Sequence, residues 1–348
     1  MQDIDHTRRV MLQMSAASAL LGVFTVPCAA ARADGISVNL YVDDHLAAYG
    51  FPDGHPLGID RQGAFLREAR NQGLVTRATT RGSRAATREE LGRFHHRDYV
   101  SRVSTAEESG LVLLDGGDTP VFPGVYSTSA HIVGAALDGV EQVMKGQSQR
   151  TLQPIGGFHH AARGHASGFC VFNDPGVVIE TLREVYGVRR VGYLDIDVHH
   201  GDGVFYAFED DPDLIFADIH QDGRTLFPGT GREHETGKGA AQGTKLNIEL
   251  APYSGDREFM QAWPRIEAHF EEFKPEFFVF QCGADGLKGD PLAQLEYTPA
   301  VHEHAAQRLV KLADQFAKGR IMAFGGGGYD RTNLAHAWSA VLREFVGS

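Results

Sequence analysis

The segment from Arg190 to Gly203 constrains this chain more than any other, because it begins as an apolar strand and ends in acids and histidines. Side chains of a strand repeat every two residues, so the alternation of Asp195, Asp197 and His199 with apolar residues predicts that the three polar groups share one face. Charged groups on so apolar a strand are costly to bury unless they are paired or bind a metal. The segment therefore predicts a buried strand that leads into a metal site.

The metal site needs ligands from a second segment, because Asp197 and His199 supply only two. Asp285 lies in a glycine-bounded turn after the apolar residues 277–280 and is the predicted third ligand. Two carboxylates and one imidazole suit Zn²⁺, Fe²⁺ or Mn²⁺. Three protein ligands leave coordination positions open, as in catalytic rather than structural sites.

The second half of the chain alternates short apolar strands with helical stretches, and nearly every strand ends in polar or glycine-rich residues. This order predicts a single α/β domain with a parallel sheet and helices on both faces. Polar groups at the carboxyl ends of such strands meet at one edge, where α/β sheets place their sites. The expected strands are residues 38–42, 151–155, 191–198, 214–219, 277–280 and 320–324, and the expected helices are 61–73, 88–103 and 126–144.

The composition is that of a globular protein, with 42% hydrophobic and 22% charged residues. A net charge of −12 argues against nucleic acid or an anionic membrane as the partner and is compatible with a cationic substrate. Three cysteines in 348 residues provide no disulfide framework. We therefore expect a small-molecule or peptide substrate, and no oligomeric state is indicated.

Residues 1–33 are predicted to be a twin-arginine signal peptide. Arg8 and Arg9 precede an apolar run over residues 14–26, and residues 31–33, Ala-Arg-Ala, match a cleavage site. The run is too short for a membrane span, and a buried helix is the alternative interpretation. We expect a periplasmic protein whose domain covers residues 34–348, with no membrane segment in the mature form.

Further residues are predicted to take part in catalysis. His159 and His160 lie in a glycine-flanked loop, and Asp195 and Asp202 are acids available to orient them. A histidine held by a carboxylate keeps a defined tautomer and a raised basicity, as a general base requires. Tyr329 follows four glycines and is a candidate donor to a developing oxyanion. Together with a metal, these groups predict hydrolysis of a carbonyl compound.

Six motifs of this chain, in their order, resemble the histone deacetylase superfamily, which also includes acetylpolyamine amidohydrolases and acetoin-utilisation proteins. The resemblance runs from about residue 38 to residue 346 and is specific for the superfamily but not for the substrate. The motifs are His159-His160-Ala161, Ser167-Gly168-Phe169-Cys170, the segment 195–203, Phe227-Pro228-Gly229-Thr230-Gly231, Gln281-Cys282-Gly283-Ala284-Asp285 and the segment 325–329.

The resemblance implies that Asp197, His199 and Asp285 bind Zn²⁺, with Fe²⁺ as the alternative. It also implies a structural K⁺ on the backbone around residues 195, 197 and 199, together with residues 218 and 219. Superfamily members often have serine where this chain has Asp218, which puts the K⁺ site in question.

The resemblance also assigns the catalytic groups. His160, paired with Asp202, would be the general base and then the acid to the leaving amine. His159, paired with Asp195, would act mainly through electrostatics. Tyr329 would bind the scissile carbonyl and its oxyanion.

Substrate contacts are implied in the same way. Phe169 and Phe227 would wall a narrow tunnel for an alkyl arm, with Gly168 at its side, although plain core packing is the alternative for both aromatics. Leu292 matches a position at the tunnel rim. Asp118 matches the acid that holds the substrate backbone at the mouth.

The expected activity is therefore zinc-dependent removal of an acetyl or other acyl group from an N-acylated amine. Polyamine-selective members can carry an acidic gatekeeper where this chain has Leu292, which favours acetyl-lysine-like compounds slightly over acetylpolyamines. Export would remove access to histones.

Two alternatives are open. An arginase-type ureohydrolase with two Mn²⁺ needs Asp-x-His-x-Asp, whereas Asp202 lies three residues after His199. A catalytically inactive periplasmic binding module for acylated amines would need neither His160 nor Tyr329. His200 has no predicted catalytic task and is expected to be a packed neighbour of the site.

Overall fold

A computed structural model describes residues 36–52 and 54–347. Within them, eight parallel strands form one sheet in the order β2-β1-β3-β8-β7-β4-β5-β6. The predicted α/β fold with a parallel sheet is thus confirmed. The strands are β1 (Val38–Tyr41), β2 (Thr79–Arg81), β3 (Arg150–Gln153), β4 (Val191–Asp195), β5 (Leu214–Gln221), β6 (Lys245–Leu250), β7 (Phe277–Gln281) and β8 (Ile321–Phe324).

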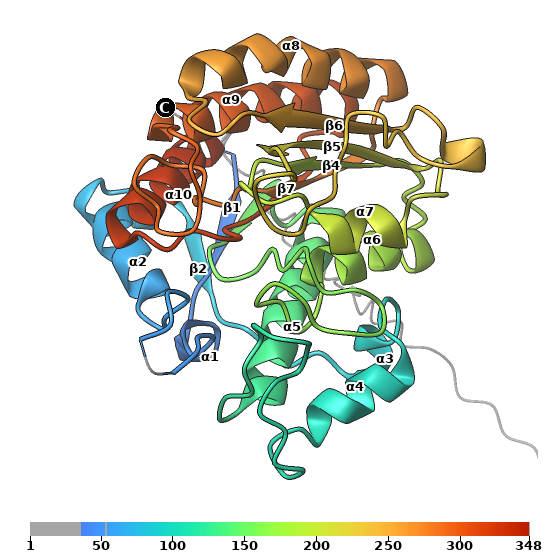
Figure 1. Cartoon of the computed structure of the whole chain (residues 1–348). Helices are drawn as coiled ribbons and strands as arrows, with labels where there is room; N and C mark the ends of the chain where they lie inside the picture. The colour runs from blue at the N-terminus through green and yellow to red at the C-terminus, as the bar shows by residue number, and fades with distance from the viewer. Residues whose placement is uncertain (1–35, 53, 348) are drawn as a thin grey trace, which may run out of the picture. The chain divides into compact units, whose positions relative to one another are not determined.

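Helices cover both faces of the sheet (Figure 1). On one face, α8 packs on α9, α9 on α10 and α10 on α2, while α5, α6 and α7 pack in series on the other face. The helices are α1 (Asp44–Ala47), α2 (Arg61–Asn71), α3 (Arg88–Leu91), α4 (Arg97–Ser104), α5 (Val125–Met144), α6 (Asp174–Glu184), α7 (Asp202–Ala207), α8 (Asp256–Phe273), α9 (Pro299–Phe316) and α10 (Arg331–Val346).

The predicted signal peptide, residues 1–33, lies outside the described residues, so export and periplasmic localisation stay predictions. Among the helices of residues 36–347, none combines the length and the apolar character that crossing a bilayer requires.

The central strands place the polar groups at one edge. Every residue of β4 and β7 is buried, as expected for parallel strands covered on both faces. At the carboxyl end of β4, Asp195 pairs in register with Gln281 of β7 and with Asp218 of β5. Three polar residues of three strands therefore meet at this edge.

The strand predicted over residues 191–198 is too long, because β4 ends at Asp195. The Asp197 backbone N–H donates to the Asp195 carboxylate at 3.0 Å, and the His199 N–H donates to the Asp197 carboxylate at 3.0 Å. Side-chain oxygens thus replace the neighbouring strands as acceptors for these amides, and the chain leaves the sheet after Asp195. Asp197 and His199 are presented by a loop, and the predicted strand face is wrong beyond Asp195.

Other element boundaries also differ from the predictions. The helix expected over residues 88–103 is broken into α3 and α4, and His220 lies inside β5 rather than after it. The strands β2 and β6 were not predicted because both lie at the edges of the sheet. β2 is short, polar and largely exposed, so no apolar run marks it.

Gly134 on α5 tests the packing of this helix. A Cβ at Gly134 would lie 1.9 Å from the carbonyl oxygen of Arg84 and 2.8 Å from the amide of Ala86. Although alanine is the better helix former by about 1 kcal/mol, we expect Gly134→Ala to lower the free energy of unfolding by about 1–3 kcal/mol through overpacking. Chemical denaturation measures this change.

Gly63→Ala on α2 is the matched control. Its nearest neighbour would be the Arg67 guanidinium at 3.5 Å, so the helix-propensity gain should appear as unchanged or higher stability. Equal stability of the two variants would contradict the tight contact at Gly134.

Candidate active site

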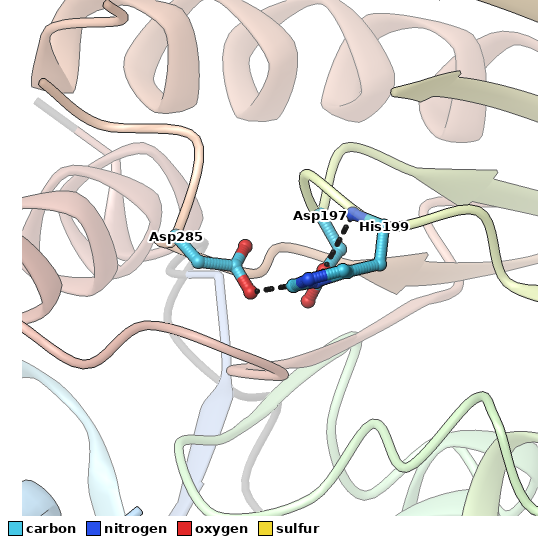
Figure 2. A group of neighbouring side chains, drawn as sticks. All are labelled: Asp197, His199 and Asp285. Carbon is cyan, nitrogen blue, oxygen red and sulfur yellow. Dashed lines mark hydrogen bonds and ion pairs between the residues drawn. The ribbon is translucent and has the colours of Figure 1, made fainter. Parts of the chain in front are cut away.

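Three buried side chains, Asp197, His199 and Asp285, converge at the carboxyl edge of the sheet (Figure 2). One ligand atom of each lies within 4.8 Å of the others, and among the described residues this is the one His/Cys/Asp/Glu group with such spacing. His199 Nδ1 is 3.1 Å from Asp197 Oδ1 and 3.2 Å from Asp285 Oδ2. Two of the residues come from the loop after β4 and the third from the loop after β7.

The chemistry of this group fits a divalent cation. Burial opposes the charged form of His199, but the carboxylates of Asp197 and Asp285 raise its pKa to about 10. Burial and the charge of Asp197 raise the pKa of Asp285 to about 6. Asp285 Oδ2 is buried and accepts no hydrogen bond from the described residues. Two crowded carboxylates and an imidazole, which include a buried oxygen whose only close polar neighbour is the His199 ring, are a donor set that suits a divalent transition metal.

Neighbouring groups orient the carboxylates. Gln281 Nε2 and the Gly327 N–H both donate to Asp197 Oδ2 at 2.9 Å, and the Val198 N–H donates to Asp285 Oδ1 at 3.0 Å. Sequence reasoning missed Gln281 as an orienting residue, although it lies only four residues before Asp285. Such contacts fix ligand geometry before an ion arrives.

The two predicted histidine–carboxylate pairs are present. His159 Nδ1 lies 2.8 Å from Asp195 Oδ2, and His160 Nδ1 lies 2.6 Å from Asp202 Oδ1. The two Nε2 atoms are 3.0 Å apart. Burial and then the charge of His159 lower the pKa of His160, while Asp202 acts in the opposite direction. The imidazole of His160 is therefore favoured in the neutral form that a base requires.

Tyr329 is held beside these groups by residues that the sequence did not single out. Its backbone N–H donates to Asp290 Oδ2 at 2.8 Å. Arg61, buried on α2, donates to the carbonyl oxygens of Gly328 at 2.9 Å and Gly326 at 2.5 Å. Burial raises the pKa of Tyr329 well above its usual value, so its hydroxyl stays protonated. Four consecutive glycines are thus fixed by contacts distant in sequence.

One cavity connects these groups. It is lined by both histidines of the pairs, the three candidate ligands and Tyr329, and two further predicted residues also line it. A Cβ at Gly168, which has a φ of +53°, would lie 2.5 Å from His160 Cδ2, so only glycine lets the loop approach the ring. Phe169 forms a wall, with its ring centroid 6.0 Å from that of Tyr329.

The other predicted substrate contacts lie farther out. Phe227 is 43% exposed, and its ring centroid is 5.0 Å from that of His160, so it borders the histidine at the surface. Asp118 is exposed and directly precedes Thr119 in the chain. The Thr119 hydroxyl accepts a hydrogen bond from the Phe169 N–H at 3.1 Å. Leu292 is half-buried. Phe227, Asp118 and Leu292 are all absent from the cavity lining, and their contacts with substrate stay predictions.

The predicted K⁺ site includes Asp218 on β5. Both oxygens of the buried Asp218 already have protein partners, the Gly201 N–H at 2.9 Å and His220 Nδ1 at 2.6 Å. A K⁺ at this position therefore stays a prediction. His200 is buried with its Nδ1 2.9 Å from the Thr230 hydroxyl, as expected for a packed neighbour.

Comparisons with known proteins agree with this geometry. The histone deacetylase domain family matches residues 55–345. The acetoin utilization protein AcuC of Bacillus subtilis (strain 168) is 38% identical over 276 residues, which cover 76% of this chain and 70% of that protein. AcuC of Staphylococcus xylosus is 33% identical over 313 residues, covering 87% and 81%. The crystal structure of the HDA15 HD domain matches with a TM-score of 0.81 at 25% identity, covering 89% and 88%.

Gln281→Ala tests the orienting contact on Asp197. Loss of the Nε2 donor should weaken divalent metal binding by about 10–100-fold, as is typical when the partner of a ligand is removed. Competition with a chromogenic chelator measures the affinity. Gln294→Ala is the control, because Gln294 contacts Gln221 rather than a ligand. Equal affinities of the two variants would show that Gln281 does not orient the ligand.

Proposed function

The chain belongs to the histone deacetylase domain family, and we propose that it is a zinc-dependent amidohydrolase that removes an acetyl or other acyl group from N-acylated amines. One observation carries the proposal. A single cavity is lined or bordered by the three candidate ligands, by the base His160 with its carboxylate, and by the protonated hydroxyl of Tyr329. Binding alone would not require this set.

The three ligand residues would hold the ion. Asp197, His199 and Asp285 provide a donor set that suits Zn²⁺ and also Fe²⁺. When bound, the ion supplies Lewis-acid activation of the amide carbonyl and of a water molecule.

His160 moves the protons in this proposal. Asp202 holds its Nδ1, so Nε2 is the atom that takes the proton from the attacking water. The same atom then returns the proton to the leaving nitrogen, which departs as a neutral amine. His159, held by Asp195, stays beside the reacting groups and favours the negative charge that develops there.

Tyr329 stabilises the transition state. Its hydroxyl donates to the carbonyl oxygen as that oxygen gains charge, and burial strengthens this bond relative to water. Arg61 and Asp290 are positioning residues, because they hold the backbone around Tyr329 and do not line the cavity.

Two features support a substrate with an alkyl arm and a cationic or neutral head. The arm would lie between Phe169 and Phe227, the two aromatic side chains next to His160 and Tyr329. The net charge of −12 favours cationic ligands. The apolar Leu292 places acetyl-lysine-like compounds slightly ahead of acetylpolyamines.

Export to the periplasm is part of the proposal and rests on the sequence pattern of residues 1–33 alone. A binuclear ureohydrolase receives less support, because Asp202 is engaged by His160 and the described residues contain a single candidate metal group. A count of two tightly bound Mn²⁺ per chain would favour that alternative.

Hydrolysis of a fluorogenic acetyl-lysine amide tests the activity. We expect turnover that a chelator abolishes and that added Zn²⁺ restores. His160→Ala should lower kcat by about 10²–10⁴-fold, and Tyr329→Phe by about 10²–10³-fold. Turnover that is indifferent to the chelator and to both substitutions would overturn the hydrolase proposal.

Asp202→Asn tests the base through the pH profile. His160 acts in its neutral form, and burial keeps its pKa low, so activity should persist as the pH falls below about 6.5, the usual pKa of histidine. Because Asp202 raises the pKa of His160, its removal should move the acidic limb of kcat/KM to lower pH while lowering kcat. Asp222→Asn, whose carboxylate binds Arg224 and Arg232, should leave the limb in place. A limb unmoved by Asp202→Asn would exclude His160 as the titrating base.

A further inference from the structure

The loop between α4 and α5 is organised around the carboxylate of Asp115. Asp115 Oδ1 accepts the backbone N–H groups of Gly117, Asp118 and Thr119, each at 3.0 Å. Asp115 Oδ2 accepts the Thr119 hydroxyl at 2.5 Å. A carboxylate that accepts from three successive amides offers the backbone a local partner in place of regular structure and fixes its path. Asp115 therefore sets where the loop places Asp118 and Thr119.

Thr119 carries this constraint to the wall of the cavity. Its side chain is buried, and its hydroxyl accepts the Phe169 N–H at 3.1 Å. Phe169 lines the cavity with a φ of +67°, a left-handed conformation that such a residue keeps only when its surroundings hold it. The Tyr49 hydroxyl donates to the Phe169 carbonyl at 2.6 Å. Thr119 and Tyr49 thus hold the backbone of Phe169 from its two sides.

The charge of Asp115 also acts on Asp118. Although burial opposes it, the Thr119 hydroxyl and the loop amides lower the pKa of Asp115 to about 2, so this carboxylate is charged at neutral pH. Partial burial, and then the neighbouring Asp115, raise the pKa of Asp118 to about 6. The charge of His160 and the Thr119 hydroxyl act on Asp118 in the opposite direction. Asp118 is thus the member of the acid pair that titrates near neutral pH.

Resting on the hydrolase function above, we propose that Asp115 is a positioning residue for substrate binding. Its one carboxylate fixes Asp118, the predicted acid at the mouth, and through Thr119 it also fixes the Phe169 wall. Both oxygens of Asp115 are engaged by its own loop, so Asp115 acts through Asp118 and Phe169 rather than on the substrate. The chemical steps belong to other residues, so Asp115 governs substrate affinity and not the rate of turnover.

The first test separates affinity from turnover with the fluorogenic acetyl-lysine amide. Asp115→Ala removes the contacts of the loop and should raise KM by about 10–100-fold, the effect of losing one hydrogen bond to a charged group, while kcat stays near the wild-type value. Thr119→Val removes only the link to Phe169 and should raise KM by less. Thr119→Ser keeps the hydroxyl and should have a lower KM than Thr119→Val.

Asp213→Asn is the matched control, because its carboxylate pairs with Arg189 just before β5, at the amino end of that strand. It should keep the KM of the wild-type protein.

The second test uses pH. A substrate N–H or a cationic head binds Asp118 best when the carboxyl is charged, so the wild-type KM should rise as the pH falls below about 6. Asp115→Asn keeps the size of the side chain but removes the charge that raises the pKa of Asp118, so the rise in KM should move to lower pH. Asp118→Asn should abolish this pH dependence. A purely structural role of Asp115 would not shift the pH at which KM rises.

Thermal melting identifies any variant that fails to fold, and Asp115→Asn and Thr119→Val then decide. Folded Asp115 variants with the wild-type KM and an unmoved pH dependence would overturn the inference, as would an Asp118→Asn variant that binds like the wild type. A loss of kcat at unchanged KM would also overturn it. No turnover by the wild-type protein of acetyl-lysine, acetylpolyamine or longer acyl substrates would instead overturn the hydrolase function on which the inference rests.

Discussion

Burial of carboxylates at the carboxyl edge of the sheet is the constraint on which the rest of the structure depends. Asp195, Asp197 and Asp285 are each at most 1% exposed. An uncompensated charge in such a place costs several kcal/mol or more. Each of these acids therefore faces a histidine, and each also accepts from a backbone amide. These contacts, rather than the apolar core, decide the path of the loops after β4 and β7.

The same constraint separates the acids into two tasks. Asp197 and Asp285 face one imidazole, His199, at distances that suit a shared cation. Asp195 and Asp202 each hold one nitrogen of a histidine from the loop after β3. The candidate metal group and the two histidine–carboxylate pairs thus lie side by side without sharing a carboxylate.

Loops rich in glycine form this site, yet distant side chains hold them in place. Arg61 of α2 fixes the carbonyls before Tyr329 although it has no carboxylate partner within the described part of the chain. The Tyr49 hydroxyl donates to the Phe169 carbonyl, and Asp174 accepts the Phe158 N–H. Both phenylalanines line the cavity. Such preorganisation is what a reaction that stabilises developing charge requires, since groups that are already aligned need no reorganisation in the transition state.

The sequence alone determined the fold class, the three candidate ligands and the residue types of the relay, because these depend on strand periodicity and on the chemistry of neighbouring residues. Resemblance to a family supplied the pairing of His159 with Asp195 and of His160 with Asp202, which the geometry reproduces. Only the tertiary structure decided that β4 stops at Asp195, and that Gln281, Arg61 and the stack of Phe158 on Tyr49 support the site. The physical reason is that most of these contacts join segments far apart in the chain. The end of β4 is set by carboxylates that replace the sheet partners of the backbone amides. A local hydrophobic pattern records neither of these effects.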